Sequence, residues 1–94
     1  MALAIATFRH KGLQELFVSG RTARIGAGHH KPSILILDHL DAATDLADLR
    51  NVRKFHALMG REAGRYSMWV SGNYRITFGW RDGRAVDVDF EDYH

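Results

Sequence analysis

The closing stretch of the chain, residues 74–94, constrains the fold more than any other part of the sequence. Apolar side chains recur at every second position from Tyr74 to Trp80, which is the periodicity of a β-strand with one buried face. Asp82-Gly83 then predicts a tight turn, because both residues tolerate the positive φ that short hairpin loops require. A second strand resumes the apolar face at Val86, Val88 and Phe90. The pattern predicts a hairpin whose second strand leads into the ionisable ending Glu91-Asp92-Tyr93-His94.

Upstream of this hairpin, the pattern indicates a strand and then helices. Residues 2–8 predict a first strand, and residues 13–17 hold apolar side chains at the spacing of one helical stripe. Gly20 fits the C-terminal cap of that helix. Residues 21–31, which include His29-His30, predict a solvent-exposed connection.

A second helix is predicted to begin near Pro32, because proline is favoured in the first turn of a helix. Its apolar stripe consists of Ile34, Leu37 and Leu40. The helix either continues through the acidic residues that follow or breaks near Thr44, with a second short helix over residues 42–49.

Strands dominate the rest of the chain. Residues 55–59 predict a short strand, and residues 66–70 predict a longer one that a turn at residues 71–73 joins to the closing hairpin. A strand, then helices, then antiparallel strands predict an α+β fold, with the helices packed on one face of the sheet. No linker or repeat divides the sequence, so we expect one domain over residues 1–94.

Composition indicates the class of protein and the cellular compartment. The chain has 94 residues, of which 46% are hydrophobic and 26% charged, as in an ordinary globular protein. The absence of cysteine excludes disulfides and thiolate metal sites, and no apolar run approaches membrane-spanning length. We therefore expect a cytoplasmic protein. The adjacent His29-His30 cannot share one face as metal ligands usually do, so we expect neither a metal nor another cofactor.

Basic side chains concentrate between residues 50 and 75, although the formal net charge of the chain is only +2. Glu62 is the only acidic residue in this interval, and the cations are Arg50, Arg53, Lys54, Arg61, Arg65 and Arg75. A local excess of this kind attracts polyanions such as nucleic acid. The same charges equally fit an ordinary solvated face.

His56, Arg75 and the ending Asp92-Tyr93-His94 are the residues that could carry chemistry. Cleavage of an RNA phosphodiester needs a base for the 2′-hydroxyl proton and an acid for the leaving 5′-oxygen. Histidine titrates near pH ~6.5 and can serve as either group. Arginine supplies positive charge to the transition state through its planar donor fork. The alternative to catalysis is that His56 is a hydrogen-bonded histidine of the core and that His94 belongs to a frayed chain end.

Several segments in order along the chain resemble the HigB group of toxins, within the RelE/ParE superfamily of type II toxin–antitoxin systems. The matching segments are Phe8-Arg9-His10-Lys11-Gly12-Leu13 with Leu16-Phe17, Phe55-His56-Ala57-Leu58 with Gly60, Asn73-Tyr74-Arg75-Ile76-Thr77-Phe78, Asp82-Gly83, Asp87-Val88 and Asp92-Tyr93-His94. Each motif is weak alone, whereas the set is specific and covers nearly the whole chain.

This resemblance implies a small RelE-like domain with one curved antiparallel sheet. It implies a toxin that cleaves mRNA on the ribosome without a metal, and so inhibits translation and growth. His56 and His94 would be the acid–base pair, with their individual roles left open, and Arg75 the phosphate clamp. Asp92 would orient a histidine or transfer a proton, and Tyr93 would position or stack on a base.

The resemblance also implies partners. The toxin would be blocked by a helix-turn-helix antitoxin of the HigA kind, and it would reach operator DNA only within that complex. Ribosome and mRNA would be its other partners, contacted by basic residues. The candidates for these backbone contacts are Arg53, Lys54, Arg61 and Arg65.

One position departs from the family pattern. The family often reads His-x-Leu-Lys-Gly where this chain has His56-Ala57-Leu58-Met59-Gly60. Met59 cannot bind a phosphate, so we expect a slower toxin unless Lys54, Arg61 or Arg65 replaces the missing contact.

Two other functions remain open from the sequence. Relatives with the same architecture inhibit gyrase by binding, although His56 and the Asp92-Tyr93-His94 ending speak against that reading. A non-catalytic RNA- or protein-binding module, in which the histidines are structural, is the other.

Overall fold

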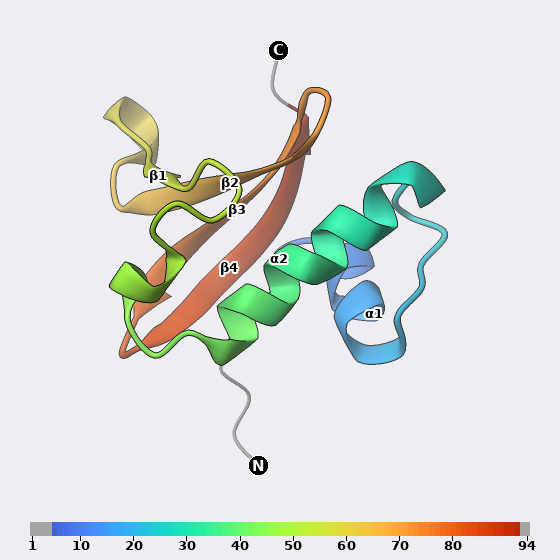
Figure 1. Cartoon of the computed structure of the whole chain (residues 1–94), viewed down its shortest axis with the longest axis horizontal. Coiled ribbons are helices and arrows are strands. Elements are labelled where there is room, and N and C mark those ends of the chain that lie inside the picture. The colour runs from blue at the N-terminus through green and yellow to red at the C-terminus, as the bar shows by residue number, and fades with distance from the viewer. Residues whose placement is uncertain (1–4, 93–94) are drawn as a thin grey trace.

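A four-stranded antiparallel sheet in the order β1-β2-β3-β4 forms the frame of the computed structural model, which describes residues 5–92. Its strands are β1 (His56–Ala57), β2 (Arg65–Ser71), β3 (Tyr74–Arg81) and β4 (Arg84–Asp92). The helices α1 (Lys11–Ser19) and α2 (His30–Ala42) lie together on one face, and the long strands curve around them (Figure 1). The predicted α+β fold with one curved sheet is confirmed.

Helix α1 begins and ends where the sequence predicts. The ring of His10 caps its first turn, because Nδ1 accepts a hydrogen bond of 3.3 Å from the backbone N–H of Leu13. Gly20 ends the helix in the left-handed region with φ 81°, as predicted for its cap. Leu13 and Leu16 are fully buried, so the apolar stripe of α1 becomes part of the core.

The segment after α2 follows the second of the two predictions, a break near Thr44 and then a separate short helix. Helix α2 ends at Ala42, and Asp45 caps the short 3₁₀ helix η2 (Leu46–Leu49) by accepting from the Ala47 N–H at 2.8 Å. Asp48 completes the capping box by accepting from the backbone N–H of Asp45. The acidic residues therefore do not continue α2 as one long face.

The prediction that His29 and His30 are solvent-exposed loop residues is wrong. His29 closes a short 3₁₀ helix, η1 (Ala27–His29), and His30 is the first residue of α2, two residues before Pro32. Both side chains are half-buried: His29 Nδ1 lies 2.6 Å from Ser71 Oγ, and His30 Nε2 lies 2.8 Å from the Ile25 carbonyl. A ring with a hydrogen-bond partner can be buried at low cost, which sequence periodicity does not reveal.

The closing hairpin forms as predicted, but β4 does not keep one apolar face. The register between β3 and β4 shifts between Thr77 and Gly79, and Asp87 takes the left-handed φ of 49°. This bulge reverses the alternation, so Val86 stands opposite Gly79, on the side away from the helices. Val88 remains in the core beside the helices. Val86 and Val88 therefore lie on opposite faces, contrary to the prediction.

The predicted first strand over residues 2–8 is reduced, in its described part, to two isolated parallel bridges, Ile5 to Ala85 and Phe8 to Val88. The bulge explains the interruption. The backbone N–H of Asp87 bonds to the side-chain hydroxyl of Thr7 at 2.8 Å rather than to a main-chain carbonyl. The segment still covers the outer edge of β4.

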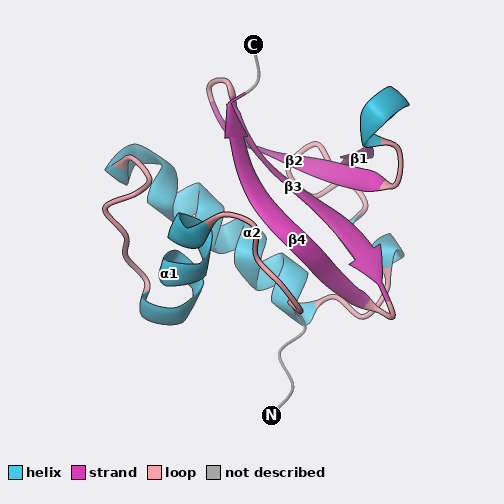
Figure 2. Cartoon of the chain, turned by 180° about the vertical axis from the view of Figure 1, so that it is seen from behind, coloured by secondary structure: helices cyan, strands magenta, loops and turns pink. Residues whose placement is uncertain are grey.

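The open face of the sheet, seen in Figure 2, carries polar side chains that are partly buried. Thr77 is fully buried at its centre. Its hydroxyl accepts from Arg65 Nη2 at 3.0 Å and donates to Glu91 Oε2, so one chain of hydrogen bonds joins β2, β3 and β4. No helix among residues 5–92 has the length and hydropathy needed to cross a membrane.

We expect Thr77→Val to lower the free energy of unfolding by about 1–3 kcal/mol, because Arg65 and Glu91 each lose a buried partner. Ser33→Ala is the matched control, since the buried Ser33 hydroxyl has no hydrogen-bond partner among residues 5–92 and its loss should be neutral. Urea unfolding of both variants measures the difference. Equal costs would contradict this account of the open face.

Candidate active site

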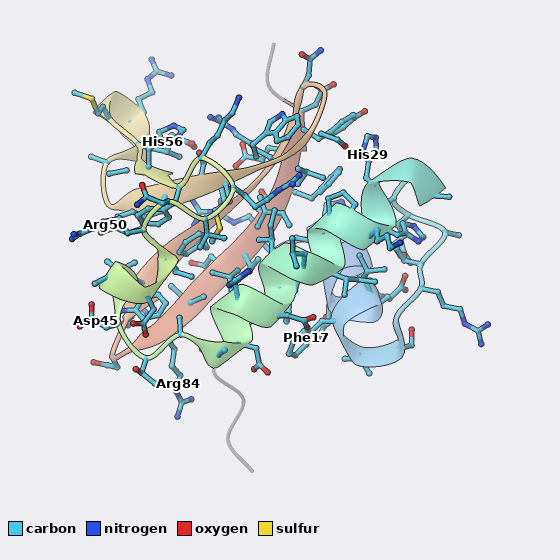
Figure 3. All side chains as sticks on the ribbon, in the orientation of Figure 1. Phe17, His29, Asp45, Arg50, His56 and Arg84 are labelled. Carbon is cyan, nitrogen blue, oxygen red and sulfur yellow. The ribbon has the colours of Figure 1, made fainter. Side chains whose placement is uncertain are left out.

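A row of side chains crosses all four strands on the open face. The register pairs His56 with Ser67, Ser67 with Thr77, and Thr77 with Asp89, so the four side chains share one side of the sheet. His56 comes from the edge strand β1, at the rim of the open face (Figure 3). The sheet therefore presents an imidazole beside a line of hydroxyl and carboxylate groups.

The main chain fixes the orientation of the His56 ring. Its Nδ1 lies 2.9 Å from the carbonyl oxygen of Lys54, which can only accept a hydrogen bond. Nδ1 therefore carries the proton of the neutral imidazole, and Nε2 has the free lone pair. The Ser67 hydroxyl lies 3.3 Å from Nε2. The residue as a whole is exposed.

A hollow of about 390 Å³ lies beside this ring. The residues that line it come from β1 and its flanking residues, from β2, from the β2–β3 turn and from the start of β3: Lys54, His56, Leu58, Ser67, Trp69, Gly72, Asn73, Tyr74 and Arg75. Two of the predicted catalytic residues, His56 and Arg75, thus contribute to one cavity although they are far apart in the sequence.

Arg75 is half-buried near the start of β3, where Trp69 of β2 and Glu91 of β4 stand opposite it. Directly opposite residues in an antiparallel pair share a face, so the guanidinium and the Glu91 carboxylate lie on the same side of the sheet. The sequence predicts Glu91 only as part of a polar ending. The alternation of side chains along a strand predicts its position, because Glu91 and Asp89 are two residues apart and therefore share a face.

Of the remaining predicted catalytic residues, Asp92 is the last residue of β4. Asp92 is exposed and pairs in register with Tyr74. Tyr93 and His94 are outside the described residues. The structure thus brings together His56 and Arg75, and places Asp92 at the strand end that adjoins the β2–β3 turn.

The four predicted RNA-binding cations differ in their contacts. Arg53 donates to the carbonyl oxygens of Trp69, at 3.1 Å, and of Val70. Arg65 donates to Thr77 and, at 2.9 Å, to the carbonyl of Asp87. Both guanidinium groups therefore hold the sheet together.

Lys54 and Arg61 are exposed, and of these two only Lys54 lines the hollow. Met59, which stands where the family often has lysine, is 86% exposed just before the 3₁₀ helix η3 (Gly60–Glu62). It does not line the hollow either.

Backbone strain concentrates next to the hollow. Arg53 and Lys54 have φ of 47° and 57°, a conformation that non-glycine residues adopt at a cost. Their contacts offset that cost: the Trp69 N–H donates to the Arg53 carbonyl at 2.7 Å, in addition to the bonds of the guanidinium. The strained pair is thereby held against β2, and the Lys54 carbonyl is placed within hydrogen-bond distance of His56 Nδ1.

Within residues 5–92, no three histidine, aspartate or glutamate side chains converge as they would around a metal ion. A second hollow of about 450 Å³ lies beside the β3–β4 turn, away from His56. Its charged lining residues are two arginines and two aspartates: Arg81, Arg84, Asp82 and Asp87. Their charges balance, so this hollow favours neither anionic nor cationic ligands.

Comparison with known proteins gives two matches. The family model described as the RelE-like toxin of type II toxin-antitoxin system HigB matches residues 6–94. The protein named Endoribonuclease HigB from Proteus vulgaris is 38% identical over 91 residues, which is 96% of this chain and 99% of that protein. Both matches extend over the sheet and the hollow.

We expect Arg53→Met to lower the free energy of unfolding by about 1–3 kcal/mol, because two backbone carbonyls of β2 lose a charged donor. Arg61→Met removes the same charge from an exposed side chain and should change stability by less than about 0.5 kcal/mol. Chemical denaturation of the two variants tests this. An unchanged stability for Arg53→Met would mean that its guanidinium is not structural.

Proposed function

Since the chain belongs to the HigB-like family of RelE-like toxins of type II toxin–antitoxin systems, we propose that it stops growth by cutting mRNA on the ribosome. It is the toxin of such a system and an endoribonuclease, as its relative from Proteus vulgaris is named. The 94 residues form one toxin domain under this proposal.

The observation that best supports a site for this chemistry is the placement of His56 and Arg75 around one hollow. In the proposed reaction, Nε2 of neutral His56 takes the proton of the RNA 2′-hydroxyl. The 2′-oxygen attacks the adjacent phosphorus, and the bond to the 5′-oxygen breaks, leaving a cyclic phosphate on one fragment. A protonated group returns a proton to the 5′-oxygen, so the step is balanced without a metal.

Arg75 is the proposed phosphate clamp. Its planar fork can offer two parallel donors to the phosphoryl oxygens, whose negative charge increases in the transition state. Asp92, Tyr93 and His94 are proposed from the resemblance alone. His94 would be the general acid, Asp92 would orient it or pass on a proton, and Tyr93 would contact a base.

The lone-pair assignment at His56 gives the two histidines different roles in this proposal. The Lys54 carbonyl accepts from Nδ1–H, so the lone pair of the neutral ring lies on Nε2. That is the form that a general base needs. The acid role then falls to His94.

Membership of the family implies an antitoxin partner. We further propose that this antitoxin is a helix-turn-helix protein of the HigA kind, that operator DNA is reached only through the complex, and that the toxin acts in the cytoplasm on ribosome-bound mRNA. A gene for such a small protein next to the gene for this chain would support the pairing.

His56→Ala should lower mRNA cleavage by about 10²–10⁴-fold, the range expected for loss of a general base. His39→Ala is the matched control, because His39 is exposed on α2, away from the hollow. Primer extension on mRNA from induced cells maps the cuts. Full cleavage by His56→Ala would exclude the proposed base. Intact mRNA together with inhibited DNA supercoiling would favour gyrase inhibition instead.

Met59→Lys should raise the cleavage rate by about tenfold or more, because it adds a cation where one transition-state contact is expected to be weak. Met59→Gln has similar length without charge and should leave the rate unchanged. Cleavage of ribosome-bound mRNA by the three purified proteins gives the comparison. No gain from the lysine would contradict the idea that the missing family lysine limits the rate.

A further inference from the structure

The side chains of Trp69 and Lys54 contact each other in the wall of the hollow, and this contact has no part in the reaction proposed above. The Lys54 ammonium lies 5.2 Å from the centre of the Trp69 ring, within cation–π range. The ring itself is fixed, because its Nε1–H donates to the Gly72 carbonyl at 3.0 Å. A flexible lysine is thus given a preferred position by a rigid aromatic side chain.

The other cations near the hollow are committed elsewhere or lie outside it. Arg53 and Arg65 donate to backbone carbonyls of the sheet, and Arg61 does not line the hollow. Lys54 and Arg75 are the cations that line it. A phosphodiester bound beside His56 would therefore meet positive charge from two sides, from β3 and from the segment before β1.

Lys54 also connects this charge to the proposed base. Its carbonyl accepts the Nδ1–H of His56, while its side chain extends over Trp69. Lys54 makes both contacts with a left-handed φ of 57°, and the hydrogen bond of the neighbouring Arg53 to β2 holds this backbone in place. Strain that is retained in this way is common at functional sites.

We propose that Trp69 is a positioning residue, which holds the Lys54 ammonium at the wall of the hollow, where it contacts a phosphate of the bound RNA. This inference rests on the proposed ribonuclease function. Direct stacking of a base on Trp69 is less favoured, because Arg53 Cζ at 4.9 Å and Lys54 Nζ already lie over its ring.

A double-mutant cycle tests the proposal with kcat and KM for cleavage of ribosome-bound mRNA. Lys54→Met should lower kcat/KM by about tenfold to a hundredfold, as for loss of a charged hydrogen bond to phosphate. Trp69→Leu should lower it by about three- to fivefold, the effect of one exposed cation–π contact. In the Lys54→Met background, Trp69→Leu should have no further effect.

Two further variants keep the cycle interpretable. Lys31→Met removes an exposed charge on α2 and should leave kcat/KM unchanged, which separates local contact from net charge. Trp69→Phe retains an aromatic face and should recover most of the activity lost in Trp69→Leu, even if the leucine variant folds poorly. Thermal unfolding of each protein monitors folding.

The possible results separate the alternatives. An effect of Trp69→Leu that persists without Lys54 would overturn the proposal, and Trp69 would then act through Arg53, whose Cζ lies 4.9 Å from the ring centre, or by stacking on a base. Unchanged activity of Trp69→Leu in the wild-type background would overturn it as well. A wild-type protein that cuts no mRNA would instead refute the ribonuclease function itself, and the inference with it.

Discussion

The attachment of Arg53 to β2 is the interaction on which the open side of this molecule depends. β1 contains two residues, and so short a strand cannot hold its own place at the edge of a sheet. The guanidinium and backbone of Arg53 supply the missing hydrogen bonds to β2. Because His56 belongs to β1, the position of an exposed imidazole is determined by an arginine three residues earlier in the chain.

The bulge at Asp87 determines which side chains of β4 reach the open face. On the side of the bulge nearer the β3–β4 turn, the Val86 side chain covers Gly79. A Cβ atom at position 79 would lie only 3.1 Å from Val86 Cγ2. After the bulge, Asp89 and Glu91 face the same side and meet Thr77 and Arg75. A single left-handed residue thus gives one strand an apolar half and an acidic half on the same face. The acidic half is the one that adjoins the hollow.

The features that the sequence predicts correctly are those that depend on neighbouring residues in the chain. The hairpin around Asp82-Gly83 and the cap at Gly20 follow from backbone preferences of the residues present, so they were predictable. The reversal at Asp87 was not, because a bulge leaves no mark in an alternating pattern. The burial of His29 depends on Ser71 and Tyr74, which approach it only in three dimensions. Likewise, side-chain chemistry and the family resemblance both point to His56 and Arg75, whereas their shared hollow and the neighbouring Trp69 appear only in the fold.

The contacts of Arg53 have a consequence for how the molecule meets other chains. An unpaired strand edge invites a strand from another molecule, and a two-residue β1 leaves much of the β2 edge without a partner strand. Beyond β1, the carbonyls of Trp69 and Val70 are occupied by a charged side chain. A strand from a second copy would have to displace that guanidinium. The residue that organises the hollow therefore also discourages the toxin from adding strands to itself, which is how edge-to-edge aggregates grow.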